Sequence, residues 1–219
     1  MFSRHDLIWL TGSGWDAALR RAVPGQHAAI EQWRRADWPA VVRRADATLA
    51  PGRLSLGIPL PPSPDGVKGR IALDAAHGDV ERHSAPLALV DAARAAPERW
   101  RPLLDVLASS MALRAYGSLA MQAITRQPYL TLTSDIDLLF LPSDAQTLQA
   151  GLALLEQHAA GLPLDGEIVF PSGAAVAWKE WIGAAGDGAG KTDARVLVKD
   201  AGAVRLATIG HLLATLEAA

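Results

Sequence analysis

The pattern of apolar and polar positions separates the chain into two parts. In the first part, short apolar runs alternate with Pro- and Gly-rich turns, which predicts strands more than helices. Extended segments are predicted at residues 2–10, 40–44, 53–60 and 68–75, and helices at residues 15–21 and 28–35. We therefore expect residues 1–85 to form a smaller N-terminal α/β module of short strands with one or two helices.

From residue 86 onward the composition turns rich in Ala and Leu, and helical spacing becomes common. Because strands come first with a crossover helix and later in hairpins, we expect an α+β domain with a mixed sheet over residues 86–219. Ser143 is the predicted N-cap of the helix at 144–160. Helices are predicted at 86–111, 117–125, 144–160 and 209–216, strands at 111–116 and 134–141, and hairpins at 165–181 and 194–208.

The segment between residues 114 and 140 carries the candidate chemistry. Asp135 and Asp137 stand two apart in an apolar strand, so their side chains point to the same face and repel each other unless a cation lies between them. Two carboxylates at that spacing suit Mg²⁺, which usually binds one or two carboxylates together with substrate phosphates. Upstream, Gly117 and Ser118 open a short helix, whose N-terminus favours a phosphate group.

Composition excludes several classes of function. The chain of 219 residues contains no Cys, which excludes disulfides and thiol nucleophiles and is compatible with a reducing cytoplasm. A formal net charge of −2 gives no basic field for nucleic acid. No apolar run is long enough for a membrane span, and the first residues lack the pattern of a signal peptide. The six His are scattered without the spacing of a zinc site.

A Gly-Ser helix start followed by an acidic-x-acidic strand resembles the nucleotidyltransferase superfamily that includes DNA polymerase β. That resemblance implies a nucleotidyltransferase-like C-terminal domain and a third acidic residue on a later strand. Glu167 fits the third place, and Asp165 is the alternative because the register of the strand is not fixed by sequence.

Seven motifs spread along nearly the whole chain are RHDLIWL, AVVRR, GIPLPP with KGRIAL, YGSLAMQ, TSDIDLLF, DGEIVFPSGAAVAWKEW and VLVKDAGAVRL. Together they resemble a narrower family, the malonate decarboxylase holo-acyl-carrier-protein synthases, which are phosphoribosyl-dephospho-CoA transferases. The resemblance implies that triphosphoribosyl-dephospho-CoA is the donor and that a serine of the acyl-carrier subunit of malonate decarboxylase attacks it, with loss of pyrophosphate.

Each candidate residue takes a role in that reaction. Asp135 and Asp137 would hold Mg²⁺, and Glu167 or Asp135 would accept the serine proton. Gly117 would admit the departing phosphates and Ser118 would hydrogen-bond them, while basic residues balance their charge. Arg114 and Lys199 are the nearest basic candidates, Lys179 and Arg126 are weaker ones, and Arg43, Arg44, Lys68 and Arg70 would grip the dephospho-CoA portion or an acidic carrier protein.

Three alternatives stay open on the sequence alone. The chain could be a general nucleotidyltransferase that adenylylates a protein or small molecule from ATP, a non-catalytic scaffold, or a D-x-D glycosyltransferase. The N-terminal module argues against the first, the intact pair Asp135 and Asp137 against the second, and the Gly-Ser helix start against the third. A Gly-rich stretch, AGDGAGKT at residues 185–192, resembles a P-loop, but a strand is predicted after it where a P-loop has a helix.

Overall fold

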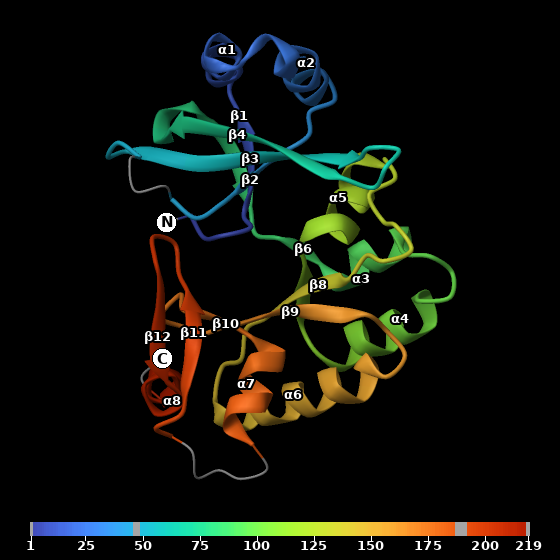
Figure 1. Ribbon diagram of the computed structural model, residues 1–219, viewed down its shortest axis with the longest axis vertical. Helices are drawn as coiled ribbons and strands as arrows, with labels where there is room; N and C mark the ends of the chain where they lie inside the picture. The colour runs from blue at the N-terminus through green and yellow to red at the C-terminus, as the bar shows by residue number, and fades with distance from the viewer. Residues whose placement is uncertain (1, 46–48, 187–191, 218–219) are drawn as a thin grey trace. The chain divides into compact units, whose positions relative to one another are not determined.

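A computed structural model describes residues 2–45, 49–186 and 192–217. The chain divides into two compact units, each built around its own sheet (Figure 1). The first unit comprises Met1–Pro86 together with Gln127–Thr131, and the second comprises Leu87–Arg126 and Leu132–Ala219. The chain therefore passes from the second unit into the first and back again between residues 126 and 132.

The first unit is a five-stranded antiparallel sheet with the order β4-β3-β2-β1-β5. Strands β3 and β4 extend one or two residues past the predicted segments and pair with each other along most of their length, whereas β1 and β2 are shorter than predicted. Its elements are β1 (Leu7–Leu10), α1 (Gly12–Arg21), α2 (His27–Arg35), β2 (Ala40–Val42), β3 (Arg53–Pro62), β4 (Lys68–Ala76) and β5 (Val80–Ser84), with short 3-10 turns at Pro24–Gln26 and His77–Asp79.

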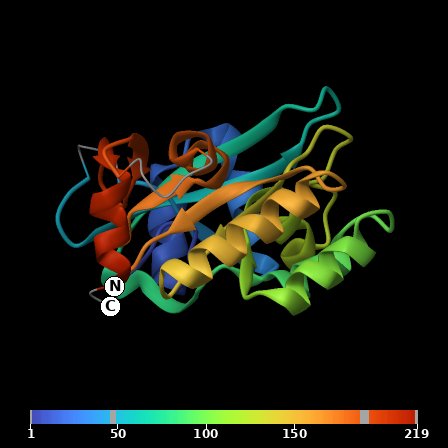
Figure 2. The same ribbon diagram turned by 90° about the horizontal axis from the view of Figure 1, so that it is seen from below.

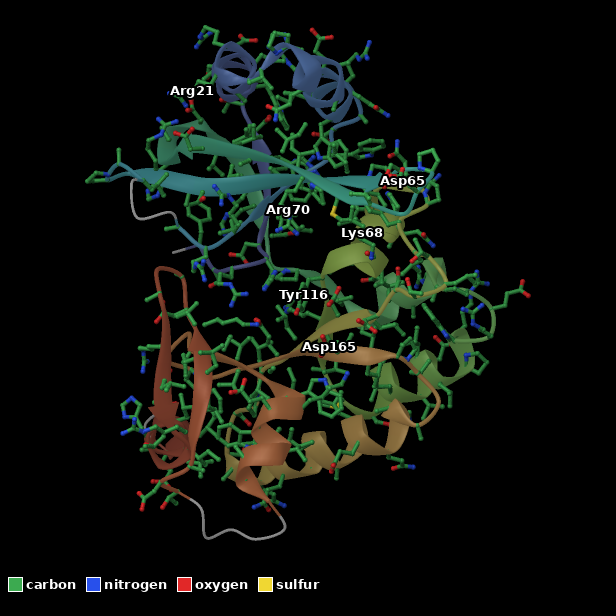
Figure 3. The ribbon with its side chains drawn as sticks, in the orientation of Figure 1. Arg21, Asp65, Lys68, Arg70, Tyr116 and Asp165 are labelled. Atoms are coloured by element: carbon green, nitrogen blue, oxygen red, sulfur yellow. The ribbon has the colours of Figure 1, made fainter. Side chains whose placement is uncertain are left out.

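Helices α1 and α2 lie side by side on one face of this sheet (Figure 1). Side chains alternate between the two faces of β3 and β4, which explains how one face is buried under the helices. Ile58 and Ile71 are register partners on these strands, and both are buried. Trp33 of α2 is 1% exposed, and its indole N–H donates to the carbonyl of Pro39. The opposite face of β4 carries Arg70, whose side chain points away from the helices (Figure 3).

The second unit has a seven-stranded sheet with the order β12-β11-β10-β9-β8-β7-β6. Strands β8 and β9 are parallel and the other neighbours are antiparallel, which confirms the α+β class and the mixed sheet. Its elements are β6 (Leu87–Ala88), α3 (Leu89–Ala92), a 3-10 turn (Ala93–Ala95), α4 (Arg101–Ser110), β7 (Leu113–Ala115), α5 (Gly117–Thr125), β8 (Ile136–Phe140), α6 (Ala145–Ala159), β9 (Leu164–Val169), β10 (Ala175–Ala177), α7 (Trp178–Ala185), β11 (Arg195–Lys199), β12 (Val204–Thr208) and α8 (Ile209–Glu217).

Helix α6 packs along one face of this second sheet, between α4 and α8 (Figure 2). Ile136, Leu138 and Phe140 point to this face, and each is at least 97% buried. Helix α6 approaches so closely that a Cβ atom on Gly151 would overlap the ring of Phe140. Side chains at the alternate positions of β8, including Asp137, therefore point to the other face.

Three local predictions are wrong. The helix predicted over residues 86–111 is not continuous, because Leu87–Ala88 form the strand β6 and residues 96–100 separate the short α3 and its 3-10 turn from α4. The N-cap of α6 is Asp144 rather than Ser143, because the Asp144 carboxylate accepts the backbone N–H of Thr147 at 2.7 Å. The hairpin predicted over residues 165–181 ends earlier, since β10 stops at Ala177 and α7 begins at Trp178. Trp178 and Trp181 lie three residues apart and are both buried, which is the spacing of a helix face.

None of the helices in the described part of the chain combines the length and hydrophobicity of a membrane span.

Candidate active site

The site begins where α5 meets β8. The backbone N–H of Tyr116 donates to the carbonyl of Asp137 at 3.0 Å, which ties the start of α5 to the strand. Gly117 follows with a φ of 65°. A Cβ atom on Gly117 would overlap the Oδ2 atom of Asp137, so only glycine fits both the backbone and the carboxylate. The sequence-predicted Gly-Ser start and acidic strand are therefore in direct contact.

Register places two further carboxylates on the face of Asp137. Asp165 on β9 is the direct partner of Asp137, and Glu167 is the partner of Leu139, two residues farther along β8. Partners on neighbouring strands point to the same side of a sheet. Gly166 between them has a φ of 134°, and a Cβ atom there would overlap the backbone of Leu138. Strand β9 therefore places both candidates for the third carboxylate, Asp165 and Glu167, on the face that carries Asp137.

Each of these two carboxylates has a lysine partner. Lys199 Nζ lies 3.2 Å from Glu167 Oε1, and the Glu167 side chain is only 5% exposed. Lys179 Nζ lies 3.7 Å from Asp165 Oδ1, with both side chains about half exposed. A lysine beside a buried carboxylate offsets the cost of removing that charge from water. The predicted phosphate-binding Lys199 therefore also serves as the counter-ion of Glu167.

The structure brings some of the other candidates of the second unit to this face, but not Arg126, which lies at the far end of α5 from Gly117. Asp135 is exposed and directly precedes β8, whereas Ser118 is buried in the first turn of α5. Arg114 on β7 is the register partner of Leu139, which puts it on the side of the sheet that carries Asp137. Arg126 is exposed at the C-cap of α5, with a left-handed backbone.

The four basic candidates of residues 43–70 all belong to the first unit. Arg43 follows β2 and donates from Nε to the carbonyl of Leu56 at 3.2 Å, while Arg44 is exposed. Lys68 and Arg70 are exposed on β4 (Figure 3). The aliphatic part of Arg70 lies over Gly57 of the neighbouring strand.

Comparison with known proteins accounts for both units. Residues 3–86 match the model of the phosphoribosyl-dephospho-CoA transferase MdcG N-terminal domain, and residues 87–209 match that of the MdcG C-terminal domain. The chain belongs to this family. It is accordingly a transferase enzyme. No solved structure matches the chain, so the polymerase β-like fold stays a prediction.

Curated relatives of the family cover most of the chain, and each is named phosphoribosyl-dephospho-CoA transferase. The relative from Xanthomonas euvesicatoria pv. vesicatoria (strain 85-10) is 42% identical over 193 residues, which is 84% of this chain and 88% of the relative. That from Xanthomonas campestris pv. campestris (strain 8004) is 38% identical over 190 residues, 84% of this chain and 87% of the relative. That from Bradyrhizobium diazoefficiens (strain JCM 10833 / BCRC 13528 / IAM 13628 / NBRC 14792 / USDA 110) is 37% identical over 206 residues, 90% and 89% respectively.

The donor set of this family member fits Mg²⁺ through its chemistry. Asp135 and Asp137 offer hard carboxylate oxygens, the ligands that Mg²⁺ prefers. Within residues 2–45, 49–186 and 192–217, no three His, Asp or Glu side chains gather closely enough to hold a metal ion by themselves. An ion held by Asp135 and Asp137 would complete its coordination with the phosphates of a substrate, as Mg²⁺ usually does.

Two other features of the second unit lie away from this face. A cavity of about 400 Å³ lies between α6, α7 and α8, on the side of the sheet opposite Asp137. The P-loop-like stretch at 185–192 follows α7 and precedes β11, which reverses the strand-to-helix order of a P-loop. Residues 187–191 of that stretch lie outside the described residues.

Proposed function

We propose that this chain transfers phosphoribosyl-dephospho-CoA from triphosphoribosyl-dephospho-CoA to a serine of the acyl-carrier subunit of malonate decarboxylase in the cytoplasm. The observation that carries the proposal is the match of both units to the two domains of one transferase family. The contact between Gly117 and Asp137 supports it, because a glycine turn at a carboxylate is a place for phosphates and their counter-ion.

In the proposed reaction the serine oxygen attacks the phosphorus nearest the ribose. A new oxygen–phosphorus bond forms, the bond to the pyrophosphate group breaks, and pyrophosphate leaves with its electron pair. Such displacements depend on alignment of the two oxygens and on neutralised phosphates, and need no nucleophile from the enzyme. Bound Mg²⁺ would neutralise phosphate charge, and Asp135 and Asp137 are the residues that would hold it.

The serine proton passes to a carboxylate of the same face. Asp165 is the direct register partner of Asp137, and its side chain is 45% exposed, so a substrate can reach it. Both carboxylates have a lysine partner, but Glu167 is only 5% exposed, which favours a positioning role for it. We therefore assign the proton to Asp165 in preference to Glu167.

The donor carries negatively charged phosphates, and basic side chains near them would balance that charge. We propose that Arg114 contacts the pyrophosphate portion and that Ser118 and Gly117 line its path. The exposed Arg44, Lys68 and Arg70 belong to the first unit, and we propose for that unit by itself that they bind the dephospho-CoA portion or an acidic carrier. Charge reversal at Arg44 and Arg70 should then weaken donor or carrier binding, whereas reversal at the exposed Arg20 of α1 should not. Unchanged affinities for both would contradict this role.

The test is the intact mass of the carrier subunit after incubation with the enzyme, Mg²⁺ and one donor. Triphosphoribosyl-dephospho-CoA should add a phosphoribosyl-dephospho-CoA group, with one pyrophosphate released for each carrier modified. ATP, tested in parallel, should add nothing. An adenylylated carrier would favour the general nucleotidyltransferase, and an unmodified carrier with both donors would favour a scaffold.

A further inference from the structure

The hairpin of β11 and β12 presents an apolar face to solvent. Leu197 and Leu206 are register partners with side chains 37% and 59% exposed, and Val204, the partner of Lys199, is 43% exposed. The alternate positions Val196 and Val198 are fully buried on the other side. A sheet with one buried face normally carries polar side chains on its solvent face. Adjacent exposed aliphatic residues at the edge of a sheet mark a surface that binds another protein.

This apolar face is continuous with the face that carries the carboxylates. Ala177 is the register partner of Glu167, and Ala175 is the partner of Lys199. The ion pair of Lys199 with Glu167, at 3.2 Å, confirms that the two strands present these side chains to the same side. Val204 is the next position across the sheet from Lys199. A protein bound on the hairpin would therefore lie beside the proposed reaction site.

We propose that the face formed by Leu197, Val204 and Leu206 docks the protein acceptor, the serine-bearing carrier subunit. This inference rests on the proposed function, since a protein hydroxyl must be brought to the side of the sheet that holds the carboxylates. One basic residue borders this apolar face. Arg195 is exposed and lies two residues from Leu197 on the same strand, so it points to the same side and would favour an acidic group on the partner.

The test compares Val204→Thr/Leu206→Thr with wild type in transfer kinetics at varied carrier concentration. Threonine keeps the β-propensity of both exposed positions, so the fold should persist. We expect the KM for the carrier to rise about tenfold while kcat and donor affinity stay near wild type. The matched control is Val106→Gln on α4, an aliphatic residue 52% exposed in the same unit, which should leave the KM for the carrier unchanged.

Each outcome separates this inference from the proposed function. If the wild-type enzyme modifies no carrier, the proposed function fails. The docking face can then still be tested, by comparing the affinity of the carrier for the wild-type enzyme and for the double variant in the absence of donor. If wild type transfers and the double variant keeps its KM and carrier affinity, docking on this hairpin is overturned. Light scattering distinguishes the remaining occupant: an enzyme dimer that dissociates in the variant, with unchanged carrier KM, would assign the face to self-association. Leu206→Glu, a second variant, should weaken carrier binding further, because a charge in the middle of the apolar face would have to be buried on docking.

Discussion

The carboxylate of Asp137 lies directly against the α-carbon of Gly117, with no room for a side chain between them. The two residues come from different elements, the start of α5 and the middle of β8, and the hydrogen bond from Tyr116 to the carbonyl of Asp137 fixes their approach. The contact places an acidic group at the N-terminal end of a helix, where phosphates also bind.

Substitution of Gly117 by Ala should reduce transfer about 100-fold, because the new methyl group displaces the Asp137 carboxylate. The positive φ adds about 1 kcal/mol of backbone strain. Gly173→Ala is the matched control, since Gly173 has a φ of 80° but no atom within 4 Å of a built Cβ. Both variants should lose similar stability in urea unfolding, and only Gly117→Ala should lose activity. Equal activity losses would mean that strain alone, and not the contact with Asp137, is responsible.

The ion pair of Lys199 and Glu167 should show measurable coupling in stability. A double-mutant cycle with Lys199→Met and Glu167→Gln, read by urea unfolding, should give about 1–2 kcal/mol because the carboxylate is only 5% exposed. The pair Lys179 and Asp165, with side chains 55% and 45% exposed, provides the control. Its coupling should stay below about 0.5 kcal/mol. A larger value for the exposed pair would contradict this order.

Asp165→Asn and Glu167→Gln should divide the roles of the two carboxylates on β9. Removal of the proton acceptor should lower kcat about 100-fold in Asp165→Asn, with little change in the KM for the donor. Glu167→Gln should lower stability more than Asp165→Asn does, because Glu167 acts through its contact with Lys199. Its effect on kcat should be smaller than that of Asp165→Asn. The measurement is steady-state kinetics alongside thermal unfolding of both variants. A greater loss of kcat in Glu167→Gln would return the base to Glu167.

The N-cap of α6 should make stability depend on pH. The backbone N–H of Thr147 and the hydroxyl of Ser143 donate to the Asp144 carboxylate and lower its pKa in the folded state. Since the folded pKa lies below the unfolded value of about 3.9, the contribution is present above that value and is lost as the pH falls through the folded pKa.

Asp144→Ala should therefore lower the melting temperature near neutral pH, and the difference from wild type should shrink below about pH 4. Asp144→Asn keeps a capping oxygen but does not titrate, so its stability should lack this pH dependence. Ser143→Ala should cost less than Asp144→Ala, because the bond from the Thr147 N–H remains. The prediction fails if Ser143→Ala is the more damaging of the two substitutions.

The sequence predicted the elements of the site because their signals are local. The Gly-Ser pair marks the start of α5, and the apolar run after Asp135 marks β8. The alternation of side chains then requires Asp165 and Glu167 to share one face of β9. Which of them stands beside Asp137 depends on how β9 aligns with β8, and strand register is set by tertiary pairing.

The other differences between the predicted and the observed structure also arise from backbone conformation or from contacts between distant residues. Ser143 and Asp144 are both good N-caps, and only the backbone conformation decides between them. The strand β5 has four exposed residues of five, so it lacks the apolar run that marks a strand. The contribution of Gln127–Thr131 to the first unit depends on burial of Tyr129, which donates its hydroxyl to the carbonyl of Pro59 at 2.8 Å. Such long-range contacts leave no periodic signal in the sequence.

In the proposed reaction, the face carrying Asp137 transfers phosphoribosyl-dephospho-CoA to the carrier. The most direct measurement is the single-turnover rate of carrier modification for Asp137→Asn, followed by intact mass with saturating triphosphoribosyl-dephospho-CoA and Mg²⁺. We predict a rate about 1,000-fold below wild type, with the folded state and carrier binding retained. A wild-type rate in Asp137→Asn would contradict the account, because the carboxylate in contact with Gly117 would then have no part in the reaction.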